Sequence, residues 1–192
     1  MNNSQRKSTG TKSVSKLNLE DLMRPTHSWM PQAVWSEVLP GLWQGGTVDR
    51  YAPDEWMRGE TGILITKQDF DSVYTMYASA EPVDWFVKEL RLGFYDSHDH
   101  GISIEQQLFE VVEAAHRDWV AGKRVLIRCQ AGLNRSGLVM GLVLIRAGYD
   151  PADAIALIRE RRSDNALFND SFVEYLLDAD LDFWRAGLAL AA

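Results

Sequence analysis

The residues of this chain best suited to covalent chemistry lie in one short run, Cys129-Gln130-Ala131-Gly132-Leu133-Asn134-Arg135-Ser136-Gly137. Cys129 is the only cysteine in the sequence, and an arginine and then a hydroxyl residue follow it six and seven positions later. An ionised thiol is a strong nucleophile, and a guanidinium binds two phosphate oxygens at once with its planar fork. The run therefore predicts hydrolysis of a phosphoester through a cysteinyl-phosphate, with the Ser136 hydroxyl donating to the sulfur as it leaves.

The segments on either side of this run are those that a phosphate-binding loop needs. Val125-Leu126-Ile127 is wholly apolar, which is typical of a central strand covered on both faces. A very apolar helix is predicted from Ser136 to Ala147, and its N-terminus adds backbone N–H groups and partial positive charge. Gly132 allows backbone geometry that a side chain would forbid. The residues predicted to bind phosphate are Gln130, Ala131, Gly132, Leu133, Asn134 and Arg135.

The rest of the chain predicts the elements that hold this loop. Residues 36–46 indicate two short strands around a Pro-Gly turn, and buried strands are predicted at 62–66, 72–76 and 90–94. A short helical turn is predicted at 53–57. A long helix is predicted to start at Ser103, with Gln106 completing a capping box, and to end at Gly122. Further helices are predicted after Asp150-Pro151 and from residue 169 or 170, the last with a single apolar stripe from Phe172 to Trp184. This order predicts an α/β domain with a mixed central sheet flanked by helices.

Composition limits the class of protein. Residues 1–24 carry five Lys and Arg against two Asp and Glu, and they predict a disordered basic tail ahead of a domain over 25–192. The whole chain has a net charge of −7, so the remainder is near −10, which argues against nucleic acid as a partner. A single cysteine excludes internal disulfides and cysteine-based zinc clusters. No signal peptide or membrane span is evident, which predicts a cytoplasmic protein, and a monomer is favoured.

The sequence C-Q-A-G-L-N-R-S-G resembles the signature of the cysteine-dependent protein tyrosine phosphatases, and most closely their compact dual-specificity branch. Residues 37–45 resemble the opening strand pair of that branch. Arg162 and the segment 169–172 resemble its region after the loop helices. The resemblance covers about residues 36–177, and it implies the phosphatase fold, a phosphorylated protein as substrate, and no metal or cofactor.

The resemblance also implies a general acid, an Asp on a separate loop about thirty residues before the cysteine. Asp96, 33 positions before Cys129, directly follows a predicted strand and is the favoured residue, while Asp99 is the alternative. The family usually has His before the nucleophile, where this chain has Arg128. Arg128 could point away and pair with an acidic residue, or it could add positive charge near the sulfur.

Other functions compete with an active protein phosphatase. A phosphate-binding pseudoenzyme would capture phosphorylated partners without cleaving them, and a non-protein phosphoester is a further possible substrate. The uncharged loop side chains favour phosphotyrosine as the substrate group, alone or with phosphoserine and phosphothreonine. A Cys–His–Asp hydrolase would leave Gly132 and Arg135 unexplained. The cluster of Asp96, His98, Asp99 and His100 could bind a metal only with converging geometry, so no metal site is predicted.

Overall fold

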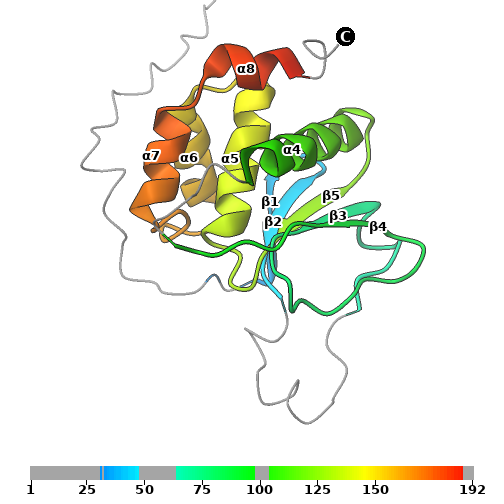
Figure 1. The fold of residues 1–192 in the computed structure, drawn as a ribbon. Helices are drawn as coiled ribbons and strands as arrows, with labels where there is room; N and C mark the ends of the chain where they lie inside the picture. Colours follow the sequence, from blue (N-terminus) through cyan, green and yellow to red (C-terminus); the bar gives the residue numbers. More distant parts are fainter. Residues whose placement is uncertain (1–30, 32, 48–63, 98–103, 188–192) are drawn as a thin grey trace, which may run out of the picture.

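The computed structural model describes residues 31, 33–47, 64–97 and 104–187. Within these residues the strands form one mixed sheet in the order β1-β2-β5-β3-β4 (Figure 1). Its strands are β1 (Trp35–Leu39), β2 (Leu42–Gly45), β3 (Ser72–Thr75), β4 (Lys88–Arg91) and β5 (Val125–Arg128). β1 runs antiparallel to β2, and the other pairs are parallel. The predicted strand pair in 36–46 and the central strand at 125–127 are therefore confirmed.

The helices are α4 (Glu105–Val120), α5 (Arg135–Arg146), α6 (Pro151–Arg161), α7 (Asp170–Leu177) and α8 (Leu181–Ala186). α5 contacts β2 and β5 on one side and α4, α6, α7 and α8 on the others, so it is the centre of the helical layer (Figure 1). Every residue of α5 from Ser136 to Ile145 is buried. Gly137 and Gly141 allow Leu167 and Leu176 to pack against this helix, because a Cβ at either glycine would collide with them. The predicted α/β class with a mixed sheet and flanking helices is confirmed.

Side chains of the central strand alternate between the two faces of the sheet. Val125 and Ile127 join the large core under the helices, whereas Leu126 joins a second, smaller cluster on the opposite face. Ile65 and Phe70 belong to that second cluster. Alternation therefore directs the Arg128 side chain to the face of Leu126, and it returns Cys129 to the helical face, where it is part of the large core.

Three predicted elements differ from the structure. Residues 64–66 are not a strand, because the Asp69 carboxylate accepts from both the backbone N–H and the hydroxyl of Thr66 and closes a turn there. The strand predicted at 90–94 is β4, which ends at Arg91. The single last helix is two helices, because the Asp180 side chain caps a new start at residues 182 and 183.

Several predictions fall outside the described residues. They include the basic tail at 1–24, the helical turn at 53–57, the first residues of the strand at 62–66, and the capping box at Ser103. The long helix itself is present as α4, and Gly122 follows its end with a φ of 81°. Asp150 caps α6 with Pro151 at the first position, as predicted. In the described part of the chain no helix has both the length and the apolar character needed to cross a bilayer.

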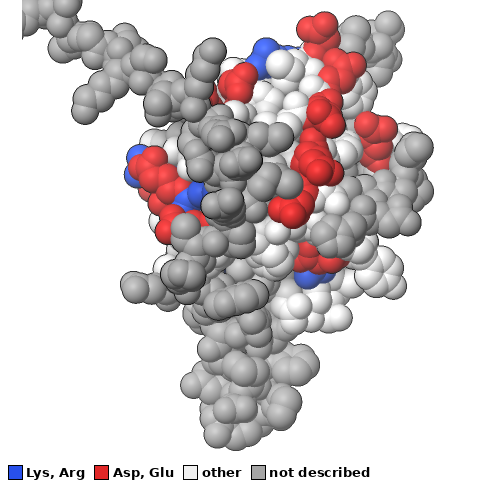
Figure 2. All heavy atoms as spheres, turned by 90° about the vertical axis from the view of Figure 1, so that its left-hand side faces the viewer, with Lys and Arg blue, Asp and Glu red and all other residues white. Residues whose placement is uncertain are grey.

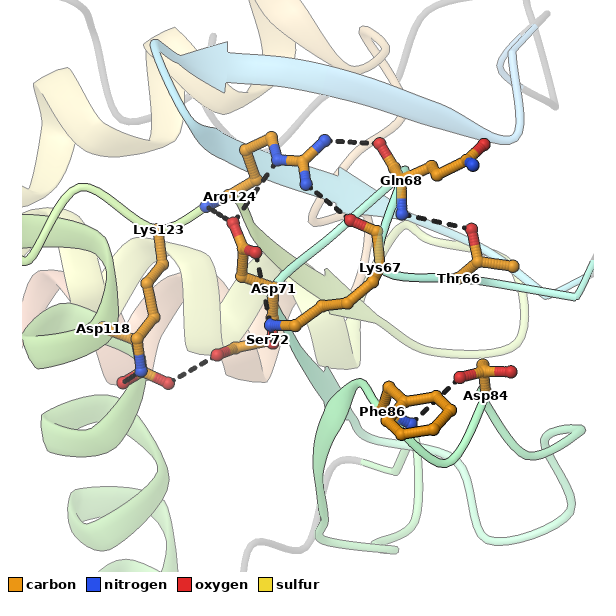
Figure 3. Close-up of polar contacts among 10 residues, drawn as sticks. All are labelled: Thr66, Lys67, Gln68, Asp71, Ser72, Asp84, Phe86, Asp118, Lys123 and Arg124. Carbon is orange, nitrogen blue, oxygen red and sulfur yellow. Dashed lines mark hydrogen bonds and ion pairs between the residues drawn. The ribbon is translucent and has the colours of Figure 1, made fainter.

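Polar clusters hold the amino ends of β3 and β5 (Figure 3). Arg124 donates to the Asp71 carboxylate and to the carbonyl oxygens of Lys67 and Gln68. The buried Asp118 carboxylate accepts from the Ser72 hydroxyl at 2.7 Å. Its other donors are Tyr74, Lys88 and Lys123. Burial alone would raise the pKa of Asp118, but these donors together hold that pKa well below its ordinary value.

Acidic side chains predominate over basic ones on the face of the molecule turned to the viewer in Figure 2, which agrees with the net charge of −7. A hollow of about 930 Å³ between α4, α7 and α8 carries the same sign of charge. Its acidic lining residues are Glu105, Glu174, Asp178 and Asp180. The negative charge is thus a feature of the folded domain.

Candidate active site

Cys129 is the first residue after the central strand, and its backbone N–H donates to the Gly45 carbonyl at 3.2 Å. The chain then curves through residues 130–134 and enters α5 at Arg135. The Cys129 side chain is 2% exposed, and its sulfur lies 3.3 Å from the Ser136 hydroxyl oxygen in the first turn of α5. The sulfur is therefore held at the N-terminal end of a helix, where the helix dipole favours negative charge.

The loop carbonyls are held by surrounding segments. The Gln130 carbonyl accepts from the N–H of Thr47 at 3.0 Å, and the Leu133 carbonyl accepts from the N–H of Leu167 at 3.3 Å. The Gly132 carbonyl accepts from the Arg162 guanidinium at 3.0 Å. The C=O and N–H of a trans peptide point in opposite directions. The N–H groups of residues 131, 133 and 134 are therefore turned away from these partners, as a phosphate-binding loop requires.

Gly132 has a φ of 70°, a conformation that L side chains rarely adopt. A Cβ at this position would also lie 2.6 Å from the Gly45 carbonyl oxygen and 2.6 Å from Arg162 Nη2. The loop therefore packs directly against the end of β2, and any side chain at residue 132 would push the two apart.

Asp96 lies beside the loop and is held there by two asparagines. Its Oδ2 accepts from Asn134 Nδ2 at 3.1 Å, and its Oδ1 accepts from Asn169 Nδ2 at 3.0 Å. Asn134 Oδ1 in turn accepts from the backbone N–H of Asn169 at 3.1 Å, and Asn169 also caps α7. The structure thus places one of the two candidate acids at the loop, whereas Asp99 lies outside the described residues.

Arg135 begins α5, and its guanidinium extends toward the segment that carries Asp96. Nη1 donates to the Phe94 carbonyl at 3.3 Å, and the guanidinium carbon lies 5.4 Å from the centre of the Tyr77 ring. Nε is buried and, within the described residues, has no hydrogen-bond partner. A buried N–H of this kind is destabilising unless an acceptor satisfies it. An anion beside Arg135 would supply that acceptor.

A cavity of about 520 Å³ brings the predicted residues together. Asp96, Gln130 and Arg135 line it, and Tyr95 forms part of its wall with a side chain that is 88% exposed. Cys129 and Ser136 do not line the cavity, because both are buried at the base of the loop. Of the other loop residues, Leu133 and Asn134 are buried, and Ala131 is half-buried.

Arg128 points away from the sulfur, which decides between the two orientations left open by the sequence. Its side chain is 1% exposed and donates from Nε to Thr75 at 3.0 Å and from Nη2 to the Glu89 carboxylate at 3.2 Å. Nη2 also donates to the Glu81 carbonyl at 2.5 Å, and Nη1 donates to the Glu81 carboxylate at 3.5 Å. Arg128, the residue that precedes Cys129, therefore anchors the opposite face of the sheet.

Sequence reasoning assigned no role at the loop to several residues that contact it from other elements, among them Thr47, Gln44 and Asn169. Asn169 and Gln44 lie in segments that resemble the family, but neither was predicted to contact the loop. A polar residue between the apolar positions of a strand was the available signal for Gln44. For a metal, the described residues hold no cluster of three or more acidic, histidine or cysteine ligands. Three of the four residues in the D-x-H-D-H cluster lie at positions 98–100, which the structure does not describe.

The chain is similar to known proteins in both sequence and fold. Residues 66–181 match the family profile described as dual specificity phosphatase, catalytic domain. The crystal structure of human DUSP28 is 22% identical, with a TM-score of 0.56 over 85% of this chain and 99% of that one. DUSP15 is 21% identical, with a TM-score of 0.55 over 79% of this chain and 92% of that one. PTPMT1 in complex with PI(5)P is 20% identical, with a TM-score of 0.56 over 83% and 100%.

These structures establish the fold, and no curated protein matches the sequence significantly. The family profile covers more than half of the chain, including the strand, loop and helix built around Cys129. The chain therefore belongs to the dual specificity phosphatase family of cysteine-dependent phosphatases.

Proposed function

We propose that this protein hydrolyses phosphoric monoesters of proteins through a cysteinyl-phosphate intermediate. The observation that carries the proposal is the convergence of Asp96 and Arg135 on one cavity at the loop that starts with Cys129. A nucleophile, a cation for the phosphate oxygens and a carboxyl group for proton transfer then serve a single site. The proposal includes a cytoplasmic setting, because thiols are kept reduced in that compartment.

The reaction has two steps. The Cys129 sulfur attacks phosphorus while Arg135 and the loop amides bind the three non-bridging oxygens, and protonated Asp96 gives its proton to the departing oxygen. In the second step Asp96 takes a proton from water, and the water oxygen attacks phosphorus. The sulfur–phosphorus bond breaks, its electron pair returns to sulfur, and the Ser136 hydroxyl donates a hydrogen bond to the thiolate that forms.

The lining of the cavity favours an aromatic phosphoester. Tyr77, Phe94 and Tyr95 contribute ring surface to it, and Arg135 is the single cation among its described lining residues. A phosphotyrosyl ring would pack against these rings. An inositol ring with several phosphates would require more positive charge than this lining supplies. We therefore infer phosphotyrosine as the preferred group, with phosphoserine and phosphothreonine as weaker substrates.

The test measures phosphate release from para-nitrophenyl phosphate by the wild type and three variants. Cys129→Ser should abolish turnover, and Asp96→Asn should lower it by about 10²–10⁴-fold. The loss in Asp96→Asn should shrink for esters with better leaving groups, because these need less proton donation. Asp164→Asn makes the same chemical change at an exposed position and should have no effect.

Normal turnover by Cys129→Ser would refute the proposal. Binding of a phosphopeptide without any release of phosphate by the wild type would show a pseudoenzyme instead. Initial rates on phosphotyrosyl peptides, phosphothreonyl peptides and vesicles containing PI(5)P test the substrate class. Faster hydrolysis of the lipid would replace the protein substrate by a non-protein phosphoester, of the kind bound to PTPMT1 in its crystal structure.

A further inference from the structure

Gln44 in β2 is a fully buried polar residue whose side chain contacts the loop that follows Cys129. Its side chain is 0% exposed and lies on the helical face of the sheet, the face to which Leu42 also points. Gln44 Nε2 is 3.2 Å from the Gly132 carbonyl oxygen and 3.4 Å from the Ser136 hydroxyl oxygen. One amide group therefore joins the middle of the loop to the residue beside the sulfur.

The orientation of the Gln44 amide follows from its partners. A carbonyl oxygen can only accept, so the amide group that faces Gly132 must be the NH₂ group. The reverse orientation would place the Gln44 oxygen against the Gly132 oxygen, with no hydrogen between them. The second hydrogen of the NH₂ group is then directed to Ser136, whose hydroxyl oxygen acts as the acceptor.

Accepting this bond determines where the Ser136 hydroxyl can donate. Once the Cys129 sulfur is ionised it can only accept, so the hydroxyl hydrogen is directed to that sulfur, which lies 3.3 Å from the hydroxyl oxygen. Gln44, Ser136 and Cys129 thus form a directed chain of hydrogen bonds that ends on the sulfur. Such a chain stabilises the thiolate, because a bonded donor is polarised and donates more strongly.

A second observation indicates that the amide is retained for more than packing. Gln44 Oε1 is buried and has no hydrogen-bond partner within the described residues. A buried acceptor without a donor is destabilising, and an apolar side chain of similar size would avoid this cost. The strand therefore carries an unfavourable group at the position that contacts both Gly132 and Ser136.

We propose that Gln44 is a positioning residue that orients the Ser136 hydroxyl toward Cys129 and so promotes departure of the thiolate in the second step. This inference rests on the proposed function, because it assigns Gln44 a part in breakdown of the cysteinyl-phosphate. Formation of the cysteinyl-phosphate depends mainly on Arg135, the loop amides and Asp96, so Gln44 affects that step less.

The first experiment compares the two steps in Gln44→Met, which keeps the length of the side chain and removes the donor. With para-nitrophenyl phosphate in a rapid-mixing instrument, the burst of nitrophenolate reports the first step and the steady rate reports the second. We expect the burst rate to stay within about twofold and the steady rate to fall about threefold to tenfold, the equivalent of one modest hydrogen bond. A merely structural role would lower both rates together.

The second experiment does not require turnover. Cys129 is the only cysteine, so its alkylation by iodoacetamide at pH 6 can be followed by mass spectrometry of the whole chain. Gln44→Met should slow alkylation by about twofold to fivefold, because the thiolate, which is the reactive form of the sulfur, loses a stabilising donor. In a Ser136→Ala background the same change should have no further effect, since Gln44 acts through that hydroxyl.

Thr47→Val is the matched control. The Thr47 hydroxyl also donates to a loop carbonyl, that of Gln130 at 3.2 Å, but it does not contact Ser136. This variant should leave the alkylation rate unchanged. Equal effects of Gln44→Met in the presence and absence of Ser136 would overturn the inference, as would an equal loss of both kinetic steps. Gln44→Leu provides a second apolar replacement if Gln44→Met does not fold.

The two experiments separate the inference from the proposed function. A wild-type protein that releases no phosphate would refute the phosphatase proposal and, with it, the kinetic part of the inference. The alkylation series would still decide whether Gln44 acts on Cys129 through Ser136. Phosphate release that depends on Cys129 but not on Gln44 would refute the inference alone.

Discussion

Replacing Arg128 by Met removes a buried cation from the face of the sheet opposite the helices. The guanidinium is 1% exposed, and its partners are the Thr75 hydroxyl, the Glu89 carboxylate, and the carboxylate and carbonyl of Glu81. Methionine fills a similar length without donors. The two carboxylates remain, with side chains that are 15% and 20% exposed.

The magnitude follows from these leftover charges. Removing one partner of a buried ion pair costs about 3–5 kcal/mol of unfolding free energy, because the other charge stays desolvated. Glu89 retains the Thr75 hydroxyl at 2.6 Å and Arg91 Nε at 3.1 Å. These partners place the expected loss near the lower end, at about 3 kcal/mol. Arg128 also holds the carbonyl of Glu81, four residues after Tyr77 in the cavity wall, so KM for phosphopeptides should rise as well.

The assay is urea unfolding at pH 7, followed by tryptophan fluorescence, for Arg128→Met and for Arg128→Met with Glu89→Gln. The second variant removes one of the leftover charges and should recover part of the loss. Arg161→Met is the control, because that side chain is 54% exposed and pairs only with exposed Glu160 among the described residues. Its effect should stay within about 0.5 kcal/mol.

A loss below about 1 kcal/mol for Arg128→Met would refute the account of a buried, paired cation. So would a double variant that is less stable than the single one, because neutralising Glu89 would then be harmful even without its partner. A changed alkylation rate of Cys129, or a lower rate of phosphate release, without any loss of unfolding free energy would instead indicate an effect of Arg128 on the sulfur.

Three further changes test other parts of the structure. Asp118→Asn should destabilise the protein by about 2 kcal/mol at pH 7. Because the folded-state pKa of Asp118 is depressed, its contribution to stability is full above about pH 5 and is lost as the pH falls further, so the variant should show a flatter pH dependence of unfolding between about pH 5 and 2. Gly132→Ala should lower phosphatase turnover by at least about tenfold, because the added Cβ would strain the loop backbone and collide with Gly45. Turnover equal to that of the wild type would contradict the close packing of the loop against β2. Leu176→Ala should lower the unfolding free energy by about 2–5 kcal/mol, because Leu176 is fully buried against α5, and an unchanged urea midpoint would show that α7 does not contribute to the core.

The parts of the fold that could be predicted from sequence have a local physical cause. Val125-Leu126-Ile127 is apolar throughout because both faces of β5 are covered, and no other element explains three such residues before a glycine loop. Asp150 and Pro151 determine the start of α6 by a side-chain cap and a fixed φ. The position of Asp96 beside the loop was also expected, although its catalytic role stays a prediction.

The rest depended on partners that are distant in the chain. Ile65 belongs with Phe70 to the small cluster on the face of the sheet opposite the helices. The apolar residues around it therefore resembled a strand although they are not one. The stripe from Phe172 to Trp184 keeps helical spacing across a break that only Asp180 reveals. Arg128 owes its orientation to carboxylates 39 and 47 residues away, which no local pattern connects to it.

The acidic surface described above has a consequence for how substrates reach the protein. A phosphorylated partner is itself an anion, so at low ionic strength the field of the domain opposes its approach before any contact is made. Dissolved salt shortens the range of that field to about 10 Å at 0.1 M, while the guanidinium and amides of the loop act at contact distance and lose much less. Encounters should therefore become more frequent as salt is added, the reverse of what a basic enzyme shows, and partners that carry lysine or arginine beside their phosphorylated residue should be met fastest.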